Sequence, residues 1–199
     1  DSTGEHNAIA ELNREIRRCP VTGLPNRRAF MEELDQRLLR GSTFALMIVD
    51  LDGFKQVNDR YGHAMGDRVI TRVGFRLRTA DPSLFASRMG GDEFAILAES
   101  DDEEGALALA RLLIDAVDQP ARFGDAEIQV GAAVGVALSP TNGIAGEELL
   151  RAADLALLSA KGHPGSHICL FTPELKLLSA RNAGVDSRVR SALRAGNID

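Results

Sequence analysis

The sequence predicts a single α/β (α+β) domain in which a central, mostly antiparallel sheet is flanked by helices. Segments with helical spacing of apolar residues alternate with short apolar runs that suit strands, and this alternation is typical of helices packed on a sheet. The composition is that of a globular domain, because 44% of the 199 residues are apolar and 26% are charged. A chain of this length can bury one hydrophobic core.

The first half of the sequence contains helix and strand signals separated by turn residues. Phe30 and Leu34 recur at helical spacing, whereas the nearly continuous apolar run over 44–49 favours a buried central strand. The elements expected here are an amphipathic helix within residues 5–18 that stops at Cys19-Pro20, a turn over 22–26, a helix over 27–39, a strand over 44–49 and a helix over 65–79.

The second half adds a hairpin and two further pairs of helix and strand. Gly90-Gly91 lies between two β-compatible runs, which is a hairpin signal. Acidic residues at the start of the next helical segment suit the positive end of a helix dipole. The elements expected here are strands over 84–89 and 94–97, a helix over 102–117, a strand over 128–138, a helix over 147–161 and a short final strand over 167–171.

Charge and cysteine content narrow the class of protein. The net charge of -6 argues against broad nucleic-acid binding through phosphates. Cys19 and Cys169 lie outside any metal-ligand spacing and suit a reducing compartment. No apolar run approaches membrane-spanning length and no signal peptide is evident, so we expect a soluble, cytoplasmic piece. Because the sequence begins without Met, we expect a fragment of a longer protein.

Three polar clusters lie at the ends of predicted elements. The first runs from Asp50 to Lys55, the second from Asn58 to Asp67, and the third is the hairpin tip over 90–93. Carboxylates at a strand end that face further carboxylates at a hairpin tip can hold hard divalent cations such as Mg²⁺, with phosphates and water as additional ligands. Paired glycines allow positive φ and let the backbone approach a ligand closely.

The surroundings of these clusters suit a phosphate-bearing ligand. Lys55 and Arg88 are placed to face a polyphosphate, and backbone amides near Phe54 could add donors. Each cluster alone has an ordinary explanation: acids near turns are usually solvated, glycine pairs often only make hairpins, and a lone histidine such as His63 is usually structural. The three clusters in this order favour one shared ligand site.

These segments closely resemble the GGDEF family of diguanylate cyclases, whose signature is similar to Arg88-Met89-Gly90-Gly91-Asp92-Glu93-Phe94 here. The resemblance covers residues 17–173 with family-like spacing. It implies a central five-stranded, mostly antiparallel sheet flanked by helices, of the nucleotidyl cyclase or polymerase-palm type, with a ferredoxin-like βαββαβ core. The matching blocks are residues 22–27, 50–67, 88–94, 153–154 and 160–161.

The resemblance also implies a role for each matching residue. Asp50, the backbone carbonyl of Leu51, Asp92 and Glu93 would hold Mg²⁺ or Mn²⁺, two ions for each bound GTP. Asp92 is the usual candidate for the general base, and Glu93 is the further acid of the catalytic pair. The other residues would bind GTP: Asn58 and Asp67 would read guanine, His63 would lie against the nucleotide, and Lys55, Lys161, Arg88 and the backbone of Gly53, Phe54, Gly90 and Gly91 would hold or approach the phosphates.

The reaction implied is the condensation of two GTP into cyclic di-GMP with release of two pyrophosphates. One domain binds one GTP, so two GGDEF domains must face each other in a symmetric homodimer. Proximity of the two bound nucleotides would then supply much of the rate.

The chain departs from the family pattern at several places, including Leu158, where an aromatic is usual, and Ala133, where a Ser is usual. Asp81 and Leu84 stand where family members often carry the Arg and Asp of an inhibitory product site, so we expect no product inhibition there. Cys19 replaces an Asp that usually pairs with an Arg such as Arg88, which should then be less firmly oriented. Segment 162–167 lacks an Arg that the family uses for phosphates. One lost charge-assisted contact costs about 1.5–3 kcal/mol.

We expect three parts: a linker helix over 1–18 from an upstream sensor domain, the GGDEF domain over 19–173, and a C-terminal linker or helix over 174–199. The apolar spacing of Val185 and Val189 resembles the first helix of an EAL phosphodiesterase domain, with an ordinary terminal helix as the alternative. Three functions stay open: an active diguanylate cyclase, a GTP-sensing module that controls an attached EAL phosphodiesterase, and a structural dimerisation domain.

Overall fold

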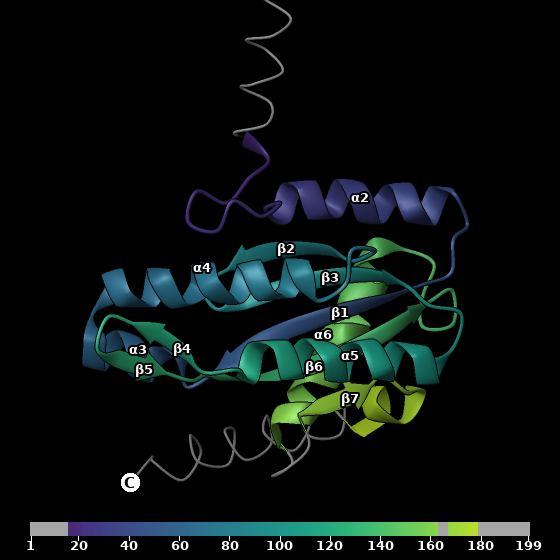
Figure 1. The fold of residues 1–199 in the computed structure, drawn as a ribbon. Helices are drawn as coiled ribbons and strands as arrows, with labels where there is room; N and C mark the ends of the chain where they lie inside the picture. The colour runs from purple at the N-terminus through teal and green to yellow at the C-terminus, as the bar shows by residue number, and fades with distance from the viewer. Residues whose placement is uncertain (1–15, 163–166, 179–199) are drawn as a thin grey trace, which may run out of the picture.

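The computed structural model describes residues 16–162 and 167–178, and Figure 1 shows one sheet between two layers of helices. Residues 173–178, at the start of the predicted C-terminal linker or helix, are helical, whereas residues 179–199 of that segment and residues 1–15 of the predicted N-terminal helix lie outside the described residues. The helices are α2 (Arg27–Leu39), α3 (Phe54–Tyr61), α4 (His63–Ala80), α5 (Glu103–Asp118) and α6 (Gly146–Gly162). The strands are β1 (Phe44–Asp52), β2 (Phe85–Gly90), β3 (Glu93–Glu99), β4 (Ala121–Phe123), β5 (Ala126–Ile128), β6 (Gly131–Ser139) and β7 (Ile168–Leu170).

The main sheet has five strands in the order β2-β3-β1-β6-β7. All neighbours run antiparallel except β6 and β7, which are parallel. The chain leaves β1 through α3 and α4 to reach the β2–β3 hairpin, and then passes through α5 to β6. This is a βαββαβ arrangement in which β1 lies between β3 and β6, so the predicted fold class is confirmed.

Strand β1 is buried on both of its faces. Its alternating side chains enter two separate cores, one beneath α3, α4 and α5 and the other against α2 and α6. Because both faces are covered, the strand is apolar along most of its length and shows no alternation in its sequence. The first core takes Ala45, Met47, Val49 and Leu51, and the second takes Phe44, Leu46 and Ile48.

The strand predicted over 128–138 is confirmed as β6 over most of its length, but its predicted start is wrong. Ile128 ends β5, which pairs with β4 in a separate two-stranded sheet, and β6 begins only at Gly131. Gly124, with φ +66°, provides the left-handed backbone for the turn between β4 and β5. Three-residue strands are too short to show a periodic pattern, and for this reason the small hairpin was not expected.

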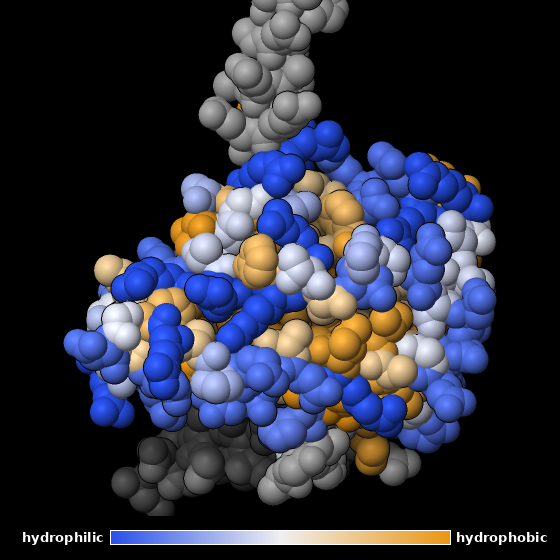
Figure 2. Space-filling model, in the orientation of Figure 1, coloured by the Kyte–Doolittle hydropathy of each residue, from blue (hydrophilic) through white to orange (hydrophobic). Residues whose placement is uncertain are grey.

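The outer surfaces of the described helices are largely polar. Figure 2 shows a mostly hydrophilic face, with apolar side chains gathered in a patch beside α5. This fits amphipathic helices that turn one stripe to the core. Within the described residues, no helix is both long enough and apolar enough to cross a membrane.

Candidate functional site

Two of the three predicted clusters meet at one end of the main sheet. Asp50, near the end of β1, lies opposite Glu93, the first residue of β3. The backbone N–H of Leu51 donates to the carbonyl of Asp92 at 3.4 Å. The end of β1 and the tip of the β2–β3 hairpin are therefore held together by the strand register itself.

Lys161 reaches the same point from α6. Its Nζ lies 2.6 Å from Oδ1 of Asp50. Asp50 and Glu93 project on the sheet face that packs against α6, because Ile48 and Ala95, two residues away on each strand, belong to that core. Lys161 is thus positioned by the packing of α6 on the sheet.

Sequence reasoning assigned no role to Asp154, which the structure adds to this group. Asp154 and Lys161 are seven residues apart in α6, close to two helical turns, and so lie on one face. The negative charge of Asp154 acts on Glu93. The helical spacing of the two charges was visible in the sequence, but their proximity to a strand end was not.

Partial burial and nearby negative charges raise the pKa of Glu93. Partial desolvation is the largest cause, followed by the charges of Asp50, Asp154 and Asp92, while Lys161 opposes the shift. The pKa of Asp154 is also raised, chiefly by desolvation, with Arg27 opposing. Mutual repulsion among acids of this kind is relieved by a bound cation.

The donor set fits Mg²⁺ in one particular mode. In the part of the chain that the structure describes, no three acidic, histidine or cysteine side chains are close enough to form a ready metal site. Mg²⁺ is usually bound through one or two carboxylates together with substrate phosphates and water. Asp50 and Glu93, paired across two strands with Asp92 next to them, suit a cation that arrives with a phosphate ligand.

The hairpin tip has a defined shape. Gly90 and Gly91 have φ of +153° and +52°, which favour glycine. Arg88 donates through Nε and Nη2 to the carbonyl of Gly91, at 3.1 and 2.7 Å, and its Nη1 lies 3.4 Å from Sγ of Cys19. The expected loosening of Arg88 is therefore limited, because the Gly91 carbonyl and the Cys19 sulfur both hold its guanidinium.

The pKa of the Cys19 thiol is shifted by burial and by several hydrogen bonds. Burial acts to raise its pKa, but hydrogen bonds from Thr22, from Arg88 and from the backbone of Val21 outweigh burial and lower the pKa to about 7. A thiolate beside Arg88 can partly replace the carboxylate expected at this position.

The second cluster lies at the junction of α3 and α4. Gly53 precedes α3 with φ +78°, and Gly62, with φ +81°, separates the two helices. Asn58 is half-buried in α3, and its side chain lies against Gly66 of α4. Asp67, the next residue of α4, is exposed. The structure brings these two residues to one junction. It places Lys55 and His63 as exposed residues in the first turns of α3 and α4.

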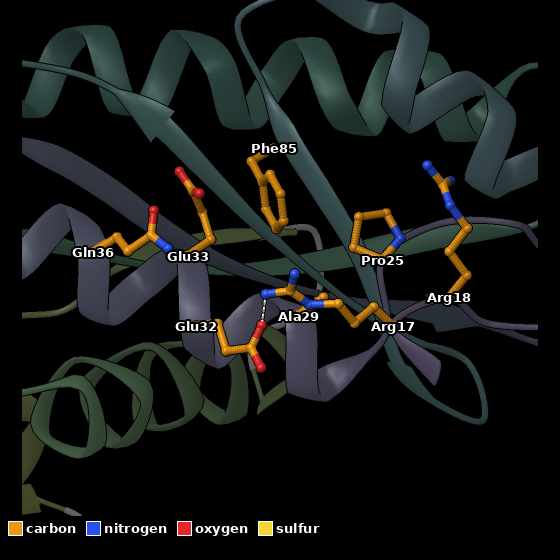
Figure 3. A pocket seen from close by; sticks show the side chains of 8 residues that line it. All are labelled: Arg17, Arg18, Pro25, Ala29, Glu32, Glu33, Gln36 and Phe85. Atoms are coloured by element: carbon orange, nitrogen blue, oxygen red, sulfur yellow. Dashed lines mark hydrogen bonds and ion pairs between the residues drawn. The ribbon is translucent and has the colours of Figure 1, made fainter. Parts of the chain in front are cut away.

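A separate groove of about 350 Å³ lies between α2 and β2 (Figure 3). It contains none of the predicted site residues, and an ion pair between Arg17 and Glu32 neutralises part of its charge.

The segment in which the family often carries an inhibitory product site, residues 81–84, comes just before β2. There Asp81 accepts bonds from the N–H and hydroxyl of Ser83, at 2.8 and 2.6 Å, and Leu84 is buried, so neither residue offers a positive charge to a phosphate.

The strand order and the acidic strand end define a domain of the ferredoxin-like, polymerase-palm class. Residues 19–167 match the family model described as diguanylate cyclase, GGDEF domain. The chain belongs to the GGDEF family.

Named relatives and solved structures agree with this assignment. The chain is 33% identical over 196 residues to the cyclic di-GMP phosphodiesterase PdeR of Escherichia coli, covering 97% of the chain and 30% of PdeR. It is 32% identical over 197 residues to the bifunctional diguanylate cyclase/cyclic di-GMP phosphodiesterase MucR of Pseudomonas aeruginosa, covering 94% of the chain and 28% of MucR. The GGDEF domain of TpbB (YfiN) from Pseudomonas aeruginosa superposes with a TM-score of 0.76 at 30% identity, covering 82% of this chain and 99% of that one.

Proposed function

We propose that this chain is the catalytic GGDEF domain of a diguanylate cyclase, which condenses two GTP into cyclic di-GMP. One observation carries the proposal: the complete signature hairpin over 90–94 lies beside Asp50 and Lys161 at one end of the sheet. The site then has both the acids that a metal-assisted phosphoryl transfer needs and a cation for the phosphates.

The chain's own residues would divide the work of binding GTP. Asn58 can donate and accept, and Asp67 can accept from the N1 and N2 donors of guanine. Lys161 would move from Asp50 to the phosphates, and Lys55, exposed at the start of α3, would add a second positive charge. Arg88 would hold the hairpin tip in its conformation, because its guanidinium donates hydrogen bonds to the Gly91 carbonyl.

In the proposed reaction, the 3′-oxygen of one GTP bonds to the α-phosphorus of the other. The bond from that phosphorus to pyrophosphate breaks, and the hydroxyl proton passes to Asp92 or Glu93. Two Mg²⁺ or Mn²⁺ ions, held by Asp50, the Leu51 carbonyl, Asp92 and Glu93, would supply charge stabilisation at the phosphate oxygens. Each domain contributes one GTP, so the active unit is a symmetric dimer of GGDEF domains.

The relatives suggest the setting of this domain. The chain spans 30% and 28% of the length of PdeR and MucR, whose names include cyclic di-GMP phosphodiesterase. We therefore propose that residues 19–173 form the GGDEF domain of a larger protein and lie in its cytoplasmic part. Residues 1–18 would connect this domain to an upstream sensor domain, and residues 174–199 would connect it to an EAL domain that follows.

Incubation of the protein with GTP and Mg²⁺, followed by nucleotide chromatography, tests the proposal. Cyclic di-GMP should form, and its formation should be lost in Asp92→Asn. GTP bound without product would instead support a second candidate, a regulatory module that senses GTP and controls an attached phosphodiesterase. That candidate is favoured by the name of PdeR and by the absence of an Arg in segment 162–167.

A further inference from the structure

Gly66 occupies a position where glycine is costly. It lies inside α4, where glycine is less favourable than alanine by about 1 kcal/mol. Its φ is not positive, so the backbone does not require glycine. A Cβ at this position would lie 1.9 Å from Oδ1 of Asn58 and 3.2 Å from the ring of Phe54. The neighbour that excludes a side chain is therefore the amide of Asn58.

The junction of α3 and α4 presses this amide against Gly66. The N–H of Gly62 donates to the carbonyl of Asn58 at 2.8 Å, and the N–H of Gly66 donates to the carbonyl of Gly62 at 3.2 Å. These bonds tie Asn58 and Gly66 to the same turn. The Asn58 amide consequently lies against the backbone of α4 at Gly66, the residue that precedes Asp67 in the sequence.

We propose that Gly66 is a positioning residue that holds the Asn58 amide beside Asp67 and thereby sets selectivity for guanine. This inference rests on the proposed GTP site. A methyl group at position 66 cannot coexist with the present Asn58 rotamer, so the amide must swing away. The buried Val57 anchors α3 independently, and therefore the helix can stay in place while the amide moves.

A role in helix packing alone would give a different result. If Gly66 only allowed α3 and α4 to approach each other, alanine would push the helices apart. Stability would fall, and the affinity for every nucleotide would fall to the same extent. If Gly66 positions Asn58, alanine leaves stability unchanged or raises it through helix propensity, and only the guanine nucleotide loses affinity.

The test compares the wild-type chain with Gly66→Ala, Asn58→Ala and the double variant. GTP and ATP affinities are measured by calorimetry with Mg²⁺, and stability is measured by urea unfolding. Gly66→Ala should lower the affinity for GTP about tenfold, the equivalent of one lost hydrogen bond, and leave the affinity for ATP unchanged. In the Asn58→Ala background the same substitution should change GTP affinity by less than about twofold. Leu112→Ala, at an exposed position of α5, a helix that contains none of the predicted site residues, should bind as the wild type does.

Unchanged GTP affinity in Gly66→Ala, or an equal loss in both backgrounds, would overturn the inference. A parallel loss for ATP would also overturn it, in favour of helix packing. If Gly66→Ala does not fold, the double variant with Asn58→Ala should fold, because it lacks the amide that clashes with the added methyl group. A double variant that is equally unfolded refutes the proposal. A wild-type chain that binds no GTP would refute the proposed function itself.

Discussion

The ion pair between Lys161 and Asp50 predicts that one substitution should strengthen metal binding and weaken nucleotide binding. In the free domain the ammonium group of Lys161 neutralises the carboxylate that we assign to Mg²⁺. A divalent cation must therefore compete with Lys161 for Asp50. Replacing Lys161 by Met, which keeps most of the side-chain volume, removes this competitor and also removes a charge for the phosphates.

The size of the effect follows from the contact. A hydrogen bond between charged groups contributes about 1.5–3 kcal/mol. Lys161 has 38% of its side chain exposed and Asp50 has 14%, so solvent screening places this pair at or below the lower limit. About 1–1.4 kcal/mol corresponds to a roughly fivefold to tenfold rise in metal affinity without nucleotide.

The assay titrates Mn²⁺ into the nucleotide-free chain and follows free Mn²⁺ by electron paramagnetic resonance. GTP affinity is measured in parallel and should fall in Lys161→Met. Lys176→Met is the matched control, because Lys176 is exposed and lines a different groove, with Phe171 and Arg151, that does not include Asp50. Unchanged or weaker Mn²⁺ binding in Lys161→Met, or an equal gain in Lys176→Met, would refute the reasoning.

Three further predictions follow from packing, titration and the product window. Gly135→Ala should destabilise the domain by about 3 kcal/mol in urea unfolding, because the added Cβ would lie 2.1 Å from the carbonyl of Ala153 and force α6 off β6; a change below about 1 kcal/mol would contradict this. The pKa of Cys19 is lowered to about 7 in the folded state from 9.0, so its contribution to stability is complete above pH 9 and is lost as pH falls through 7. The stability difference between wild type and Cys19→Ser should accordingly grow by at most about 3 kcal/mol from pH 6 to pH 9, and an equal difference at both pH values would refute the link. Added cyclic di-GMP should not inhibit turnover through the window from Asp81 to Leu84, and inhibition with product bound at that surface would disprove it.

Local signals in the sequence predicted most elements of the fold. The helix over 27–39 was predicted with both ends correct, since Asn26 precedes it and its side chain accepts a bond from the N–H of Ala29. The apolar run over 44–49 predicted β1, and the glycine pair predicted the β2–β3 hairpin. These features depend on residues close in sequence, so periodicity and turn chemistry were sufficient.

Contacts between distant segments could not be predicted in this way. The pairing of Lys161 with Asp50 depends on how α6 crosses the sheet, and the approach of Asn58 to Gly66 depends on the angle between two helices. Neither leaves a local pattern. The sequence suggested that Arg88 had lost a partner at Cys19, whereas the thiol remains within 3.4 Å of its guanidinium.

The register of β1 against β3 explains why the acids of the site face α6. Side chains alternate along each strand, and residues directly opposite each other share a face. Ile48 and Ala95 lie in the core against α6, so Asp50 and Glu93, two residues further toward the hairpin, must project on that side. A shift of the β1 register by one residue would turn Asp50 away from Lys161. It would also exchange the two sets of β1 side chains between the two cores. The apolar cores on both sides of β1 therefore determine the position of the acidic site, although their buried side chains have no proposed contact with the ligand and only the backbone carbonyl of Leu51 is assigned to the metal.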